Sequence, residues 1–209
     1  MSIRSRVLAA AVELLGRQGL KALTHLKVDE AAGVPGGSTS NYFRTRAALL
    51  AGVAEWLAKQ DYVAVEGPAS PPPKSDAFVA LLARTVENAT TVFRTRTIAR
   101  YVLFLEGTHN EAVRSQLLTG RTYFRSFIET AMERYGAPDP GAAATAITAV
   151  GEGMIIQRLT VDPDVDVFTP IDGVVRAFLP QAAKPGRGCC TTRAAPDNPV
   201  IDVESFGLR

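Results

Sequence analysis

Residues 36–42 combine two glycines with small side chains that donate and accept hydrogen bonds. Such residues are poor helix formers, costing roughly 0.5–1 kcal/mol each relative to alanine, so packing alone does not explain them. They fit the edges of DNA bases. Asn41 can form two hydrogen bonds with adenine, Ser38 and Ser40 can donate or accept, and a thymine methyl can meet the methyl of Thr39. A glycine- and serine-rich loop without a partner is the alternative that composition leaves open.

The residues beside this stretch suit a sugar–phosphate backbone. Gly36 and Gly37 carry no side chain and would let that backbone approach closely. Tyr42, Arg44 and Arg46 can bind phosphates through a hydroxyl or a positive charge. Together with the base-reading residues, they predict a surface that binds DNA.

Charge is distributed unevenly along the chain. Residues 1–50 hold seven basic and three acidic groups, whereas the formal net charge of all 209 residues is only +2. A basic first quarter on a slightly acidic remainder favours a polyanionic partner. Chance scatter of surface charge is the alternative.

Other functional classes lack their characteristic residues. The two cysteines are adjacent, Cys189-Cys190, and His25 and His109 are the only histidines, so we expect no disulfide scaffold, no metal and no cofactor. The sequence has no phosphate-binding loop and no nucleophile elbow, and we therefore expect no enzyme. No apolar run approaches the roughly 20 residues needed to cross a bilayer, which predicts a soluble, cytoplasmic protein without a membrane partner.

Apolar residues recur at helical spacing and no series of alternating strands occurs, so the predicted fold is all-α with about nine helices. A first helix over residues 3–18 stops at Gly19. Thr24 caps a second, short helix, and Pro35 opens a third that carries residues 36–43. Two short helices joined by a tight glycine-containing turn indicate a helix-turn-helix.

The rest of the chain predicts a helical body. Thr45 caps a fourth helix, and a ninth has Thr169 as its cap, Pro170 in its first position and Asp172 as partner in a capping box. The fifth to eighth helices lie near residues 78–93, 98–107, 110–135 and 142–159, with Gly120 a possible bend in the seventh. The chain thus divides into a head at residues 1–46, a body at residues 47–180 and a flexible tail at residues 181–209, in which the role of Cys189-Cys190 stays open.

The stretch from Ala31 to Leu50 reads AAGVPGGSTSNYFRTRAALL, with glycine at position 37, the aromatic pair Tyr42-Phe43 and a basic residue before a leucine pair. With the upstream helix that ends in Gly19, it resembles the N-terminal DNA-binding domain of the TetR family of bacterial transcriptional regulators. The resemblance implies a homodimeric, ligand-responsive repressor whose third helices enter the major grooves of a palindromic double-stranded operator.

Carried over position by position, the resemblance implies DNA contacts at Thr24, His25, Gly36, Gly37, Ser38, Ser40, Asn41, Tyr42 and Arg46. His25 taken alone fits an ordinary surface residue equally well. Gly36 replaces a frequent lysine of the family and Ser40 a frequent tyrosine, so the operator sequence stays open. Arg46 replaces the usual lysine and keeps its charge.

The resemblance also implies a ligand pocket among the fourth to eighth helices and a dimer seam formed by the last two. The eighth helix is rich in alanine and glycine, which lets helices approach closely across a seam or within one subunit. An apolar effector would contact residues drawn from Trp56, Tyr101, Phe104, Leu105, Tyr123, Phe127, Met154 and Gln157, each of which fits a core position as well. A DNA-binding regulator controlled by a protein partner, without a small-molecule effector, is the alternative.

Overall fold

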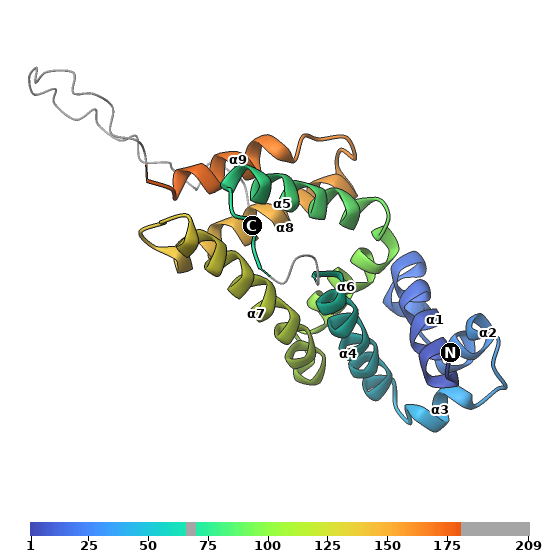
Figure 1. The fold of residues 1–209 in the computed structure, drawn as a ribbon. Coiled ribbons are helices and arrows are strands. Elements are labelled where there is room, and N and C mark those ends of the chain that lie inside the picture. Colours follow the sequence, from blue (N-terminus) through green and yellow to red (C-terminus); the bar gives the residue numbers. More distant parts are fainter. Residues whose placement is uncertain (66–69, 181–209) are drawn as a thin grey trace, which may run out of the picture.

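The computed structural model describes residues 1–65 and 70–180, and this part of the chain is helical throughout, without strands (Figure 1). The prediction of an all-α fold with about nine helices is confirmed. The elements are α1 (Ile3–Gln18), the 3₁₀ turn η1 (Leu20–Ala22), α2 (His25–Ala32), α3 (Ser38–Tyr42), α4 (Arg46–Val65), α5 (Ser75–Thr90), α6 (Arg94–Glu106), α7 (Glu111–Arg134), α8 (Pro140–Thr160) and α9 (Phe168–Ala177). The tail expected at 181–209, with Cys189-Cys190, lies outside the described residues.

The helices form two groups (Figure 1). α1, α2 and α3 make a small head at one end of the molecule, while α5, α8 and α9 lie together at the other. α4 runs beside α7, and α6 packs along α1. α6 therefore joins the head to the body. α7 continues through Gly120 without interruption.

Several predicted helix ends are confirmed. Gly19 ends α1 with a φ of 75°, a conformation that favours glycine, and its N–H donates to the carbonyl of Leu15. The hydroxyl of Thr24 accepts from the N–H of Lys27 at 3.3 Å, as an N-cap should. The hydroxyl of Thr45 does the same for α4.

The third helix is shorter than predicted. α3 begins at Ser38 rather than at Pro35, because Gly37 adopts a φ of 88°, a left-handed conformation incompatible with a continuous α-helix. The N–H of Ser38 donates to the carbonyl of Pro35, which closes a turn ahead of the helix. Gly36 and Gly37 therefore belong to the turn and not to the helix.

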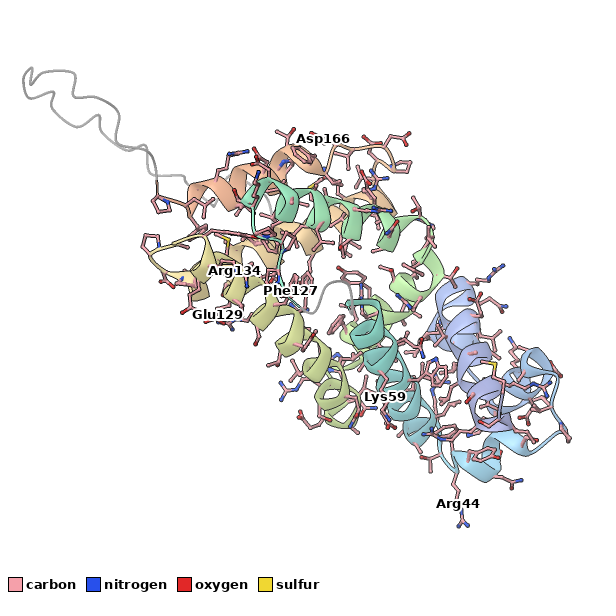
Figure 2. The ribbon with its side chains drawn as sticks, viewed as in Figure 1. Arg44, Lys59, Phe127, Glu129, Arg134 and Asp166 are labelled. Carbon is pink, nitrogen blue, oxygen red and sulfur yellow. The ribbon has the colours of Figure 1, made fainter. Side chains whose placement is uncertain are left out.

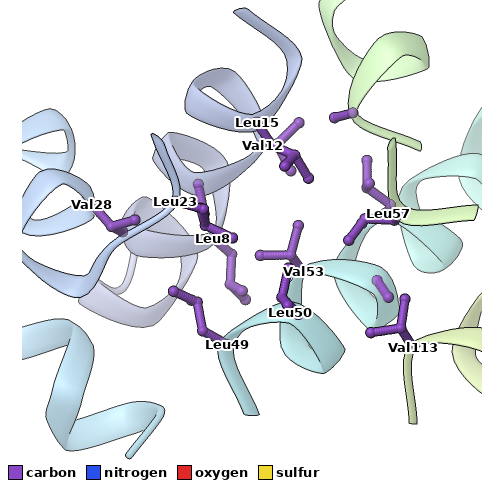
Figure 3. Close-up of a cluster of buried hydrophobic side chains, with 14 of the residues drawn as sticks. Leu8, Val12, Leu15, Leu23, Val28, Leu49, Leu50, Val53, Leu57 and Val113 are labelled. Atoms are coloured by element: carbon purple, nitrogen blue, oxygen red, sulfur yellow. The ribbon is translucent and has the colours of Figure 1, made fainter. Parts of the chain in front are cut away.

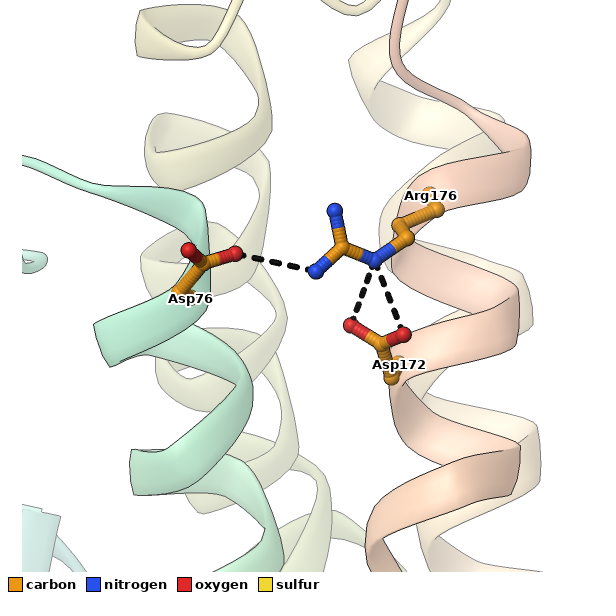
Figure 4. Close-up of polar contacts among 3 residues, drawn as sticks. All are labelled: Asp76, Asp172 and Arg176. Carbon is orange, nitrogen blue, oxygen red and sulfur yellow. Dashed lines mark hydrogen bonds and ion pairs between the residues drawn. The ribbon is translucent and has the colours of Figure 1, made fainter.

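The predicted capping box of α9 is wrong. Thr169 lies inside the helix, and the carboxylate of Asp166 accepts from the N–H groups of Phe168 and Thr169 at 2.9 and 3.3 Å. A carboxylate there also neutralises the positive end of the helix dipole, which a threonine hydroxyl does not. Asp172 pairs with Arg176 instead, and Arg176 reaches Asp76 of α5 at 3.0 Å (Figure 4).

One buried apolar cluster extends from the head into the body (Figure 3). Leu8 and Leu15 of α1 and Val28 of α2 pack with Val53 and Leu57 of α4. Leu103 of α6 and Val113 of α7 complete the cluster, and all seven side chains are at most 1% exposed. The core thus continues across residue 46, and the head shares its packing with α4, α6 and α7.

α1 and α6 meet closely at Gly16. A methyl group there would overlap the carbonyl oxygen of Thr95 and lie 2.7 Å from its Cγ2. Only glycine lets the two helices meet this closely.

We therefore expect Gly16→Ala to lower the free energy of unfolding by about 1–3 kcal/mol, the usual effect of overpacking. Urea denaturation monitored by circular dichroism measures it. Gly151→Ala is the matched control, since nothing lies within 4 Å of an added methyl there and alanine favours the helix. Equal stability of the two variants would contradict the close packing of α1 on α6.

Candidate nucleic-acid interface and ligand cavity

A buried carboxylate holds the turn between α2 and α3. Asp29 is only 3% exposed, and it accepts hydrogen bonds from the N–H of Gly37 at 2.7 Å, the N–H of Thr39 at 2.7 Å and the hydroxyl of Thr39 at 2.5 Å. These donors come from the turn and from the first residues of α3. Asp29 therefore fixes the direction in which α3 leaves the turn.

Burial alone would raise the pKa of Asp29, but the hydrogen bonds from Thr39 and Gly37 outweigh it and hold the pKa below its usual value. The nearby His25 acts in the same direction. The carboxyl is thus ionised at neutral pH and accepts every hydrogen bond offered to it. Sequence reasoning missed Asp29, because the donors that it accepts from lie eight and ten positions further along the chain.

Two further side chains, those of Arg6 and His25, hold the head together by hydrogen bonds to backbone carbonyls. Arg6 donates to the carbonyls of Ala32 and Gly33, both at 2.7 Å, and so closes the end of α2. The Nε2–H of His25 donates to the carbonyl of Phe43 at 2.6 Å, which joins the start of α2 to the end of α3. One ring nitrogen of His25 is thus already hydrogen-bonded inside the head.

Arg46 has the same kind of role. Its guanidinium donates to the carbonyls of Leu23 at 2.5 Å and Leu20 at 2.7 Å, linking the start of α4 to the segment before α2. The sequence placed Arg46 at a DNA phosphate. In the structure Nη1 and Nη2 each donate to a carbonyl inside the head, while Arg46 remains an exposed residue.

Thr39 also differs from its expected role. Its side chain is fully buried and its hydroxyl donates to Asp29, so its methyl does not face a thymine. The expectation of a base contact at Thr39 is therefore wrong. The periodicity of a five-residue helix is too short to show which side faces inward.

The exposed face of α3 carries the remaining candidates. Ser40, Asn41 and Tyr42 are exposed, Tyr42 at 48%. Ser38 is half-buried, and its hydroxyl donates to the carbonyl of Pro35 at 2.6 Å. Arg44 follows the helix and projects away from the molecule (Figure 2). The structure thus gathers the neutral hydrogen-bonding side chains on one short exposed surface with a cation beside it.

The head also carries cationic side chains without a partner among the described residues. The side chains of Lys21, Lys27 and Arg44 are exposed and have no hydrogen-bond or ion-pair partner in residues 1–65 and 70–180. Thr24, Gly36 and Gly37 are exposed as well. By contrast, Arg4 pairs with Glu55 at 3.7 Å, so only part of the basic excess of the head is free for an anionic partner.

A cavity of about 230 Å³ lies in the body, between α5, α6, α7 and α8. Tyr101 and Phe104 of α6 and Tyr123 of α7 line it, and all three were candidates from the sequence. Burial raises the pKa of Tyr101 to about 12, and the charge of Glu152 acts in the same direction against Arg100 and Arg121. The Tyr101 hydroxyl therefore stays protonated and can donate.

The other five candidates do not line this cavity. Trp56 packs against the core shared by head and body, and Met154 is buried in a second cluster in the body. Phe127, labelled in Figure 2, packs on Phe78 with ring centroids 6.2 Å apart. Leu105 is 72% exposed, and Gln157 is exposed too. Aromatic and apolar residues at helical spacing therefore do not show whether a side chain lines a cavity or packs in the core.

Sequence reasoning also missed the polar residues of the cavity. Arg96 and Arg100 of α6, Arg121 of α7 and Glu152 of α8 line it. The spacing of Arg96 and Arg100 places them on one helical face beside an aromatic pair, which was a usable signal. Within residues 1–65 and 70–180 there is no group of three side chains suited to a metal, and no helix there is long and apolar enough to span a membrane.

The Asp29 network makes a testable contribution to stability. Because the folded state lowers the pKa of Asp29, its stabilisation is present above the unfolded pKa of about 4 and is lost as the pH falls through the lower folded value. Asp29→Asn should lower the free energy of unfolding at neutral pH by about 1–3 kcal/mol, because one amide N–H would face a backbone donor. The same substitution should also make the free energy of unfolding less dependent on pH in the acid range.

Urea unfolding at neutral pH and acid unfolding followed by circular dichroism measure these effects. Glu30→Gln, a change at the exposed neighbour on the same helix, is the control. If both variants unfold alike at every pH, Asp29 does not hold the turn.

Solved structures resemble this chain over most of its length. The multidrug binding protein EbrR in complex with ethidium is 25% identical, with a TM-score of 0.68, over 86% of this chain and 100% of that one. A TetR family member from Streptomyces coelicolor A3 is 24% identical with a TM-score of 0.71, covering 87% and 100%. A TetR regulator from Haloarcula marismortui is 14% identical with a TM-score of 0.74, covering 85% and 98%. The last two show the fold alone.

Family models match both parts of the chain. The model of bacterial regulatory proteins of the tetR family matches residues 7–53, which include α2, α3 and the start of α4. The model of the tetracyclin repressor-like C-terminal domain matches residues 73–182, more than half of the chain. No curated protein sequence matches. The chain belongs to the TetR family of DNA-binding transcriptional regulators.

Proposed function

We propose that this chain is a homodimeric repressor that binds a palindromic operator through α3 and leaves it when a small molecule occupies the cavity. The observation that carries DNA binding is the exposed face of α3, held in place by the buried Asp29 network. This face offers the hydrogen-bonding groups of Ser40, Asn41 and Tyr42 to a partner. Such a regulator acts in the cytoplasm, where bacterial DNA lies.

The head divides its contacts by side-chain chemistry. Asn41 and Ser40 read base edges, because they are short, exposed and able to bond in both directions. Arg44 and Lys27 bind phosphates, because their side chains are exposed and have no partner in the described residues. Arg46 and His25 act mainly by holding the reading surface together.

The exposed side of α8 supports dimerisation with a second copy. Ala142, Thr145, Ala149, Gly153 and Ile156 recur every three or four residues and are exposed. Nothing lies within 4 Å of a methyl group built at Gly153. This stripe of mostly small residues lets the same helix of another chain pack closely against it, and α9 extends the surface beside it.

α6 couples the cavity to the head. Tyr101 and Phe104 face the cavity from α6, and the same helix meets α1 at the Gly16 contact. A ligand that shifts α6 would therefore shift α1 and, with it, α3. In a dimer this changes the distance between the two α3 helices that contact DNA. The cavity, and the small molecules ethidium and proflavin bound by EbrR, favour this arrangement over a regulator without a small-molecule effector.

The proposed division of roles is tested with two alanine variants. Asn41→Ala should cost roughly 1–3 kcal/mol per base contact on the operator and leave binding to unrelated DNA nearly unchanged. Arg44→Ala should weaken binding to both DNAs and lower the salt slope by about one unit per subunit. Fluorescence anisotropy at several salt concentrations measures both.

Arg17→Ala is the control, since Arg17 lies in the last turn of α1 and pairs with Glu13 at 3.0 Å. The assignment fails if Asn41→Ala weakens both DNAs equally while Arg44→Ala affects the operator alone. Loss of binding in the control as well would point to general charge rather than to the α3 surface.

The dimer is tested at Ala149. Light scattering of the wild type should give about twice the chain mass of 22.3 kDa. Ala149→Arg places a charge in the seam without touching the core, and we expect a folded monomer. Val175 is unsuitable for this test because it is fully buried. Ser126→Arg, on an exposed position of α7, should leave the dimer intact, and a dimeric Ala149→Arg would exclude α8 from the interface.

A further inference from the structure

The charged side chains at the cavity wall already have partners. Arg121 holds Glu152, the only acidic residue among the described residues that line the cavity, with Nη1 at 2.7 Å from Oε1 and Nη2 at 3.0 Å from Oε2. Neither Arg96 nor Arg100 is without a partner. Moving a charge from water into a mainly apolar cavity is costly unless an opposite charge pairs with it. A charged ligand would therefore have to displace an existing interaction, whereas an uncharged ligand would not.

Two uncharged polar side chains at the same wall have no hydrogen-bond partner. Asn88 of α5 and Thr148 of α8 both line the cavity. Asn88 is half-buried, and its side-chain amide makes no hydrogen bond within residues 1–65 and 70–180. The Oγ1 of Thr148 is buried and has no partner in this part of the chain either. The polar groups that a ligand can satisfy without displacing anything are therefore neutral.

Thr148 differs from two other threonines of α8. Thr145 and Thr160 donate to the carbonyl four residues earlier, at 2.9 and 2.7 Å, which is a common way to satisfy a hydroxyl inside a helix. Thr148 does not make this bond. Because no hydrogen bond holds its Oγ1, the side chain can change between the two rotamers that a helix allows for threonine, exchanging hydroxyl and methyl, without losing one. The hydroxyl is thus available to a ligand in the cavity.

What these groups lack is an acceptor. The hydroxyl of Thr148 and the amide N–H groups of Asn88 can donate, and the hydroxyl of Tyr101 stays protonated because burial raises its pKa to about 12. Apolar and aromatic side chains make up most of the remaining wall, so the rest of the ligand must be apolar. An oxygen acceptor on an apolar frame would satisfy a buried donor that is unpaired in the free chain.

We propose that the cavity binds an uncharged aromatic carbonyl compound, whose oxygen accepts a hydrogen bond from Thr148 while its ring packs against Phe104 and Tyr101. A cavity of about 150 Å³ accommodates one benzene ring. The 230 Å³ here therefore fits one ring with a short side chain that carries the carbonyl. The role of this ligand as effector rests on the proposed function, whereas its binding does not.

Three compounds of similar shape test the preference for an uncharged ligand: 4-phenylbutan-2-one, 3-phenylpropionate and 4-phenylbutan-2-amine. Titration calorimetry on the full chain at about pH 7 compares a neutral ketone, an anion and a cation. We expect the ketone to bind about tenfold more tightly than either ion, because only the ions must displace an existing charge interaction. An ion that binds as tightly as the ketone, or more tightly, overturns the proposal.

A substitution of nearly equal shape tests the hydrogen bond. Thr148→Val should weaken binding of 4-phenylbutan-2-one about tenfold. It should also raise the melting temperature of the free chain, because it removes a buried hydroxyl that has no partner there. Thr85→Val is the matched control: Thr85 lines the same cavity, but its hydroxyl already donates to the carbonyl of Leu81 at 2.8 Å, so ketone affinity should not change.

Two results would contradict a role for the Thr148 hydroxyl. If Thr148→Val binds the ketone as tightly as the wild type, or if Thr85→Val weakens binding equally, the carbonyl is not bound at Thr148. A lower melting temperature in free Thr148→Val would show that the hydroxyl is already satisfied, and the proposal fails in that case too.

Calorimetry uses no DNA, so its result does not depend on operator binding. Ketone binding by a chain that binds no operator would support the ligand class and contradict the proposed function. Operator release by the anion or the cation, with no ketone binding, would support the proposed function and overturn the ligand class.

Discussion

The head depends on one buried carboxylate. Removing an ionised group from water is expensive, and the cost is offset only when hydrogen bonds replace the lost hydration. Asp29 obtains three such bonds from Gly37 and Thr39, and these donors define where the turn ends and α3 begins. Thr39 must therefore point inward. The next residues along the five-residue helix are then left in water, so the exposed surface of α3 follows from the way Asp29 is satisfied.

The head is also bound to the body by a shared core. Leu8 and Leu15 of α1 pack with α4 and α6, and Gly16 brings α1 against Thr95. Packed interiors deform little, so a displacement of α6 is passed on rather than absorbed. The same helix carries aromatic and cationic residues into the cavity. A ligand in the cavity could therefore act on the exposed face of α3 through α6 and α1. All of these contacts lie in the described residues.

Local features were predictable from the sequence and features set by tertiary packing were not. Thr24 and Thr45 cap the helices that follow them because a cap needs only its own next three residues. The predicted cap of α9 was wrong because Asp166 accepts from the N–H groups of Phe168 and Thr169, so the helix already begins ahead of Thr169. The inward side of Thr39 depends on Asp29, ten residues earlier, and no periodicity within α3 reveals it.

The lining of the cavity is likewise set by tertiary packing, and the sequence predicted only part of it. Tyr101 and Phe104 were recognised as candidates, but Met154 and Phe127 were equally plausible, since all of them are large apolar residues on helices. Which helical face meets a neighbour and which meets a void depends on how four helices cross. The charged residues that line the cavity were missed for a related reason. Arg121 and Glu152 lie 31 positions apart in the sequence, and only the fold pairs them.

Selection of DNA fragments by the purified chain, from the genome that encodes it, tests the central claim most directly. The fragments are sequenced, and the recovered site is titrated with protein whose thermal unfolding shows that it is folded. The account predicts one enriched motif with twofold symmetry, its half-sites about one helical turn apart, bound by two chains per motif. Recovery of no enriched sequence, or of a motif without symmetry bound by a single chain, would contradict it.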